Sequence, residues 1–238
     1  MASIWMNTEG GLKVLYKYRK PLTFTAQEAG SVALTKVGTP PDCTFEYRTD
    51  TGGGWSEWDV YTIGDVVALE VGQKMQIRGT NTTLASSKDN YHKFVMTGKI
   101  AASGNVSSLL VPKGTNVLTS SNTFRSLFYG CTSLGSAPEL PATTLVNSCY
   151  NSMFSGCTSL VTAPELPATT LVNYCYIYMF ENCNKLACIK VGATEWNTTA
   201  CFNWVNGVAS TGTFTKPTAL TIPTGANGMP NGWTINNI

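Results

Sequence analysis

Two glutamates have the residue type and spacing closest to a catalytic pair. Glu139 and Glu165 lie 26 residues apart, at the same position of a repeated segment. Stacking of the repeats would place them on neighbouring coils, in the manner of the paired carboxylates of a retaining glycosidase. That chemistry needs a pocket that raises one pKa, whereas a flat repeat surface leaves both carboxylates in water. We therefore expect no catalysis at this pair, with weak cation or sugar binding as the alternative.

The single histidine, His92, is the other residue that could act as a general base. It alternates with Phe94 and Met96, which places all three on one face of a strand. A general base needs a partnered nucleophile, and the sequence has neither a Gly-x-Ser-x-Gly elbow nor a phosphate-binding glycine loop. We interpret His92 as a strand-face histidine and predict a protein that is not an enzyme and has no cofactor.

Most of the eight cysteines lie in or beside the repeats. These are Cys131, Cys149, Cys157, Cys175, Cys183 and Cys188. No Cys-x-x-Cys pair occurs, which argues against zinc. Thiols stacked on adjacent coils could meet disulfide geometry, but a column of three cysteines cannot pair completely. We predict reduced, buried thiols that fill space in the core and bind no metal.

The element that positions these residues is a direct repeat. Segments 131–156 and 157–182 are identical at 19 of 26 aligned positions, and 183–186 begin a third copy. A unit this short cannot enclose its own apolar side chains, so the copies must stack as in a solenoid, with like residues over like. The predicted core columns are Leu134 with Leu160, Leu140 with Leu166, Leu145 with Leu171, Met153 with Met179, and Phe154 with Phe180.

Prolines divide each copy into two parts. Pro138 and Pro141, repeated at Pro164 and Pro167, forbid an α-helix and favour an extended backbone. Residues 147–154 contain no proline, and there we expect one short helical turn.

The rest of the 238-residue chain divides into three parts. Residues 1–20 form an N-terminal arm. Residues 21–104 alternate in short runs between turns, as is typical of a β-sandwich, with a glycine-rich hairpin tip at 50–54 and with Trp55 and Trp58 on opposite strand faces. The repeats occupy residues 105–191, and the aromatic-rich residues 192–238 are the predicted cap.

The repeats resemble a known family. Residues 153–160 and 163–167 resemble the BspA-like leucine-rich repeats of surface proteins from gut and oral anaerobes. Residues 204–210 and 229–235 are similar to the tail of that group, and residues 46–50 and 55–58 to the domain that often precedes its repeats. The resemblance implies a mainly β fold, with an N-terminal β-sandwich, a short BspA-like leucine-rich-repeat solenoid and an aromatic C-terminal cap. It also implies adhesion, in bacteria or their phages.

Charge and hydropathy limit the partners. Only 13% of residues are charged and the net charge is +2, which gives no strong field for nucleic acid. No segment approaches the 18 apolar residues of a membrane span, and the first twenty residues lack the apolar run of a secretory signal. We therefore favour a virion surface over a bacterial cell surface as the location.

Differences between the copies mark a candidate binding surface. The second copy gains Tyr174, Ile177, Tyr178 and Glu181 where the first has small or polar residues. Tyrosine suits stacking on sugars and protein interfaces. The alternative is that these residues pack beneath the cap.

Alternation in the arm suggests an assembly role. Leu12, Val14, Tyr16 and Tyr18 are spaced two apart among basic residues. Such a segment can pair with a sheet edge of another subunit, including a second copy of this chain in a homo-oligomer. Alternatively, it can add a strand to its own domain. We expect a non-catalytic fibre or decoration protein of a phage of gut bacteria that presents its repeats to a host surface glycan or protein. A bacterial adhesin and a glycan-active enzyme are the alternatives.

Overall fold

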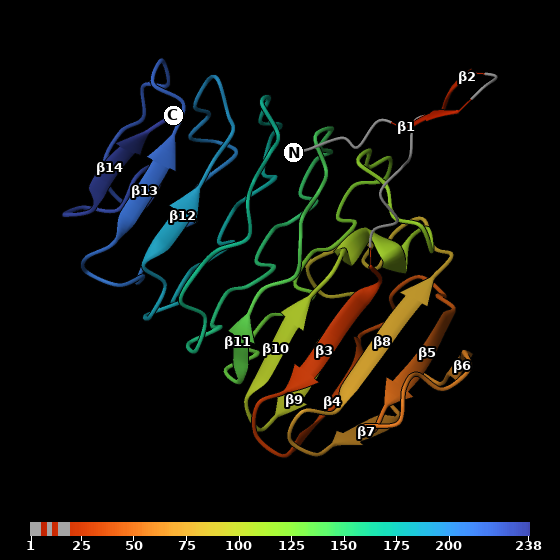
Figure 1. The fold of residues 1–238 in the computed structure, drawn as a ribbon. Helices are drawn as coiled ribbons and strands as arrows, with labels where there is room; N and C mark the ends of the chain where they lie inside the picture. Colours follow the sequence, from red (N-terminus) through yellow and green to blue (C-terminus); the bar gives the residue numbers. More distant parts are fainter. Residues whose placement is uncertain (1–5, 9–10, 14–19) are drawn as a thin grey trace.

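The structure is a computed structural model that describes residues 6–8, 11–13 and 20–238. It confirms that the chain is mainly β, with several sheets and almost no helix in the described part (Figure 1). None of the helices in the described ranges has the length and apolar character needed to span a membrane.

The described residues form fourteen strands and one 3-10 helix, η1. In chain order they are β1 (Met6–Thr8), β2 (Gly11–Lys13), β3 (Leu22–Ala26), β4 (Gly30–Val37), β5 (Phe45–Asp50), β6 (Asp59–Tyr61), β7 (Val66–Leu69), β8 (Lys74–Gly79), β9 (Tyr91–Thr97), β10 (Ile100–Ser103), η1 (Val106–Leu109), β11 (Leu134–Ser136), β12 (Cys188–Lys190), β13 (Thr213–Lys216) and β14 (Thr234–Asn237).

Two sheets are formed by strands β3 to β10 together with β11 of the first repeat copy. One has the strand order β11-β10-β3-β8-β5-β6 and the other β7-β4-β9. Their inner faces carry the apolar residues of each alternating strand, and the ring of Phe24 on β3 meets that of Phe94 on β9 at 4.8 Å. In Figure 1, β3 and β8 lie in front of β4 and β9, so the outward face of the larger sheet faces the viewer.

The repeated segments stack with like residues over like. Phe128, Phe154 and Phe180 form a column with ring centres 5.3 and 5.7 Å apart and planes tilted by 8°. Backbone N–H groups of Phe128 and Phe154 donate to the carbonyl oxygens of Met153 and Met179 in the following copy, both at 2.9 Å. The predicted leucine, methionine and phenylalanine columns are all buried, in one core that also includes the two N-terminal sheets.

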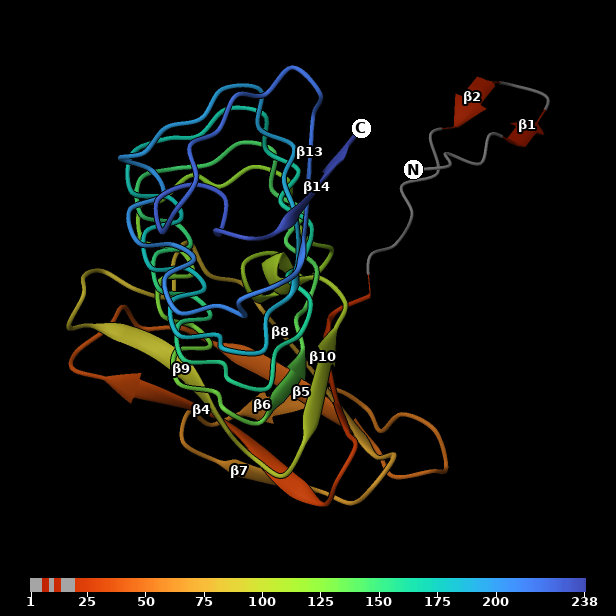
Figure 2. The same ribbon diagram turned by 90° about the vertical axis from the view of Figure 1, so that its left-hand side faces the viewer.

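The predicted helical turn in each copy is wrong. Residues 121–130, 147–156 and 173–182, which we call the turn segments, are chains of tight turns (Figure 2). Within one of them, Ser148, Ser152 and Gly156 have φ values of 57°, 55° and 76°. A left-handed residue at every fourth position interrupts an α-helix. The intervening N–H groups bond alternately inside the segment and to the next copy, which a helix would not permit.

The stack ends under aromatic side chains. Residues 198–207 bond to the turn segment 173–182, for example from the N–H of Phe180 to the carbonyl of Trp204 at 2.8 Å. Trp204 is fully buried, and its indole N–H donates to the carbonyl oxygen of Gly228 at 2.7 Å. The parallel sheet β12-β13-β14 lies on the other side of the same end (Figure 1).

Candidate functional site

The residues predicted as a binding surface lie on two sides of the stack. Tyr174, Ile177, Tyr178 and Glu181 belong to one turn segment, where Tyr174 is 43% exposed. The rings of Tyr178 and Phe202 make an edge contact at 5.7 Å, so part of this group packs against residues 198–207, which belong to the predicted cap.

Glu139 and Glu165 lie outside the turn segments, in the part of each coil that forms parallel bridges, where Leu166 beside Glu165 bridges Val191. A carboxylate oxygen of Glu165 accepts from the ammonium of Lys190, the last residue of β12, at 2.7 Å. The backbone of Glu139 forms a parallel bridge with Asn105, and its side chain is exposed. The pair therefore sits at the surface, with a lysine on one member, and neither residue lines the two hollows described below.

The arm is described only in part. Leu12 lies in β2, which pairs antiparallel with β1 in a two-stranded sheet. Val14, Tyr16 and Tyr18 lie outside the described residues.

His92 is buried on β9 beside Phe94 and Met96, which confirms the strand-face prediction. Its Nδ1 lies 2.9 Å from the carbonyl oxygen of Leu84. Burial lowers the pKa of the imidazole, because the charged form loses its hydration. The neutral side chain is packed in the sheet and does not face a hollow at the surface.

Five of the six cysteines in or beside the repeats are buried free thiols, but Cys188 is exposed, so the prediction of burial is wrong for Cys188. Burial raises the pKa of Cys131 and Cys149 to about 12. Among the described residues no three His, Cys, Asp or Glu side chains come together in a way that could hold a metal ion.

A cleft of about 650 Å³ on the outward face of the larger sheet is lined by polar and aromatic side chains. Its lining residues come from β3, β5, β8 and β10 and from the loops beside them. They are Lys20, Pro21, Thr23, Thr25, Arg48, Trp55, Trp58, Lys74, Gln76, Arg78, Ser103, Pro112 and Lys113. We call this hollow the cleft.

Strand register builds the floor of the cleft. Gln76 on β8 lies opposite Thr23 on β3 and opposite Arg48 on β5. Because Met75 and Ile77 point into the core, Gln76 and its neighbours two residues away point outward. The side-chain amide of Gln76 donates to the hydroxyl of Thr23 at 3.1 Å, and its oxygen accepts from Nε of Arg48 at 2.9 Å.

A glycine-rich loop forms the wall. β5 and β6 form the predicted antiparallel hairpin. A carboxylate oxygen of Asp50 accepts from the N–H groups of Gly52 and Gly54 at 3.0 and 3.2 Å, and both glycines have the positive φ that such a tip requires. Trp55 and Trp58 follow this tip.

Both tryptophans line the cleft, so their predicted placement on opposite strand faces is wrong. Residues 56–58 are not part of a strand, and the alternation of a strand therefore does not apply to them. The guanidinium carbon of Arg48 lies 4.9 Å from the ring centre of Trp55 and 4.6 Å from that of Trp58. That of Arg78 lies 3.9 Å from Trp58. These cation–π contacts join the loop to the strands.

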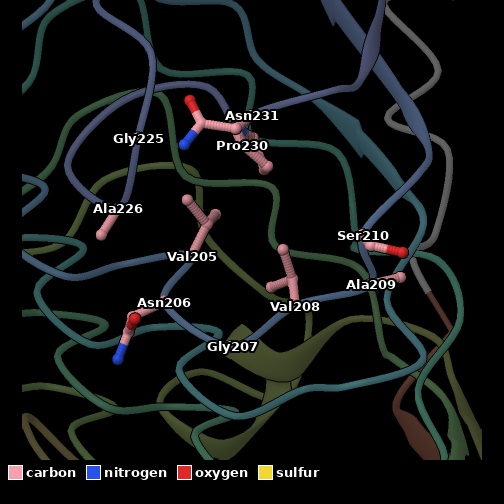
Figure 3. A pocket seen from close by; sticks show the side chains of 10 residues that line it. All are labelled: Val205, Asn206, Gly207, Val208, Ala209, Ser210, Gly225, Ala226, Pro230 and Asn231. Atoms are coloured by element: carbon pink, nitrogen blue, oxygen red, sulfur yellow. The ribbon is translucent and has the colours of Figure 1, made fainter.

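A second hollow, of about 200 Å³, lies beside residues 198–207 at the end of the stack (Figure 3). Small side chains and two asparagines surround it, and none of its lining residues is charged. They are Val205, Asn206, Gly207, Val208, Ala209, Ser210, Gly225, Ala226, Pro230 and Asn231. It offers less volume and fewer side-chain functional groups than the cleft.

Neither a protein-family model, a curated protein nor a solved structure matches this chain. The choice between the two hollows therefore depends on their chemistry, and the cleft is the better candidate. Sequence reasoning did not find it, although the outward positions Lys74, Gln76 and Arg78 of β8 are an evident alternating polar series.

Proposed function

We propose that the chain is a non-catalytic glycan-binding protein of a phage virion surface, a fibre or decoration protein that recognises bacterial hosts of the gut. The cleft is the proposed binding site. The repeats are the proposed BspA-like leucine-rich-repeat solenoid, placed between a β-sandwich and an aromatic cap. In this proposal the solenoid is the rigid support of the domain that carries the cleft.

The observation that carries the proposal is the chemistry of the cleft. Sugars are bound by aromatic walls together with a few fixed hydrogen-bonding groups. The cleft has two tryptophans, the hydroxyls of Thr23 and Thr25, and the amide of Gln76. Its volume of about 650 Å³ falls in the range of about 300–1,000 Å³ that is usual for sites of small ligands.

The rigidity of the stack supports display. Each copy is held to the next by backbone hydrogen bonds and by columns of stacked rings, such as Phe154 on Phe180. Because the stack shares one core with the two sheets, it gives the sheet that carries the cleft a rigid support.

A glycan-binding assay tests the site. Polysaccharides from the surfaces of gut bacteria are immobilised as an array and probed with the whole protein, with Trp58→Ala and with Phe202→Ala. Phe202 is an exposed aromatic residue away from the cleft, so it serves as the matched control. We expect Trp58→Ala to lose binding and Phe202→Ala to keep it. Binding that survives Trp58→Ala places the glycan elsewhere, and an array without binding contradicts the proposed function.

The location needs a separate test. Mass spectrometry of purified virions and of bacterial envelopes asks which of them contains the chain. Presence in virions supports the fibre or decoration role. Presence in envelopes alone would favour the bacterial adhesin.

A further inference from the structure

The side chains that line the cleft carry charge of one sign. Among the thirteen lining residues that the structure describes, Lys20, Arg48, Lys74, Arg78 and Lys113 are basic and none is an aspartate or glutamate. We propose that the ligand of the cleft is an acidic oligosaccharide, one that carries carboxylate or sulfate groups. This inference rests on the proposed function and adds the chemical class of the glycan.

The basic residues are concentrated rather than spread. The whole chain has 16 lysines and arginines against 14 acidic residues, a net charge of only +2. Five of those 16 basic residues surround one hollow. Arg78 also pairs with Glu46, which accepts from its Nε at 2.7 Å and has a half-exposed side chain outside the lining. A concave surface lined by one sign of charge concentrates ligands of the opposite sign.

Arg48 is held in place before any ligand arrives. Its Nε donates to Gln76, which is 5% exposed and donates in turn to the hydroxyl of Thr23. That hydroxyl donates to the carbonyl oxygen of Pro21 at 2.8 Å, so the chain of donors ends on the backbone. The guanidinium also makes cation–π contacts with both tryptophan rings. A side chain fixed in this way loses little conformational freedom on binding.

The chemistry of the guanidinium matches an oxyanion. Its bond to Gln76 uses one of five N–H donors. A planar guanidinium can bind a carboxylate through two parallel hydrogen bonds, and it binds sulfate oxygens with the same donors. Lys74 lies one outward position from Gln76, about 7 Å along β8, so a second acidic group on the same chain of sugars has a cation within reach.

The same features argue against single-stranded nucleic acid. Binding of that kind needs open aromatic faces for bases and a basic track for the backbone. Here the cations surround one hollow instead of forming an extended track for a phosphate backbone.

Matched pairs of ligands test the inference. We would titrate the whole protein by calorimetry with a trigalacturonate and with its methyl ester, in which a methyl group on each carboxyl removes the charge. A chondroitin sulfate tetrasaccharide and its unsulfated form make the second pair, and a single-stranded oligodeoxynucleotide is the third probe. We expect an acidic member to bind at least about tenfold more tightly than its less charged partner, as the loss of a charge-assisted hydrogen bond implies. The pair that shows the difference identifies the acidic group.

Variants then assign the preference to the cleft. Arg48→Gln should remove most of the tenfold difference in affinity. Lys74→Gln should also reduce this difference, and it provides the test if Arg48→Gln does not fold. Lys185→Gln removes one exposed positive charge from the repeats and should leave the difference unchanged. Thermal melting of each variant checks that it is folded.

The outcomes separate the two proposals. Equal binding of charged and neutral partners overturns the acidic class and leaves the glycan-binding function standing. Tighter binding of the oligodeoxynucleotide than of any saccharide also overturns it. Absence of binding to every saccharide contradicts the proposed function, and the acidic class with it.

Discussion

The thiol of Cys157 donates a hydrogen bond to the carbonyl oxygen of Phe128, with 3.1 Å between sulfur and oxygen. The same contact joins Cys183 to Phe154 at 3.0 Å. At the start of the stack, the thiol of Cys131 donates to Phe94 on β9 at 3.1 Å. Each thiol thus reaches back to the coil or strand before it, and the cysteine column holds the register of the copies and joins them to the sheets.

Replacement of Cys157 by alanine should destabilise the protein. The change leaves a small cavity and removes a buried hydrogen bond, and we expect the free energy of unfolding to fall by about 1–3 kcal/mol. Urea denaturation measures it. Cys188→Ala is the control because Cys188 is exposed, and its effect should stay within about 0.5 kcal/mol. Equal effects of the two changes would refute a structural role for the column.

The buried thiols should make stability depend on pH at the alkaline end. Burial raises the pKa of Cys131 and Cys183 from 9.0 to about 12. Between these values the folded chain keeps protons that the unfolded chain releases, so their stabilisation is complete below pH 9 and is lost as pH rises. Each thiol contributes a slope of up to about 1.4 kcal/mol per pH unit. Urea midpoints at pH 8, 9.5 and 10.5 measure it.

Cys131→Ala is the test of that assignment. With one buried thiol removed, the loss of stability between pH 9.5 and pH 10.5 should become smaller than in the parent protein. An unchanged slope would assign the alkaline loss to other groups, such as the buried Tyr150, whose pKa is also raised by burial.

Tyr174 occupies a backbone position that suits asparagine better. Its φ is 62°, and the equivalent Asn122 of the first turn segment has 59°. A bulky residue in the left-handed region is strained, whereas asparagine adopts it readily. We expect Tyr174→Asn to raise the free energy of unfolding by up to about 1 kcal/mol. Tyr129, another exposed tyrosine but without a positive φ, provides the control Tyr129→Asn, which should give no gain.

The same variant compares the two candidate surfaces. If the glycan binds in the cleft, Tyr174→Asn should leave its affinity unchanged. A loss of affinity would favour the surface of Tyr174 and Tyr178 that the differences between copies predict.

The core of the repeats could be predicted because identity at a fixed period reports stacking directly. Leu160 and Phe180 are buried where the period of 26 residues places them. The turn segments could not be predicted in the same way. Gly156 is a visible signal for a left-handed residue, but Ser148 and Ser152 adopt the same φ without any sequence mark. Hydrogen bonds to the next copy hold them there, and those depend on the stacked structure.

The cleft was missed for a different reason. Its floor depends on strand register, since Thr23, Arg48 and Gln76 are far apart in the sequence and meet only because β8 pairs with both β3 and β5. Its wall depends on a loop that does not continue the strand pattern, which brings Trp55 and Trp58 to one side. Neither feature is encoded in a local period.

Asp50→Ala provides the sharpest test of how the cleft is built. Asp50 is a negative charge close to a basic cleft, so electrostatics alone predicts that its loss tightens the binding of an acidic saccharide. Its carboxylate also fixes the loop through Gly52 and Gly54. We expect the second effect to dominate, with stability lower by about 1 kcal/mol and affinity lower by about tenfold. Glu57→Ala removes an exposed acidic side chain from the same loop and should leave affinity equal or higher. Calorimetric titration of both variants with the acidic saccharide decides the matter, since tighter binding by Asp50→Ala would mean that charge rather than loop position controls the site.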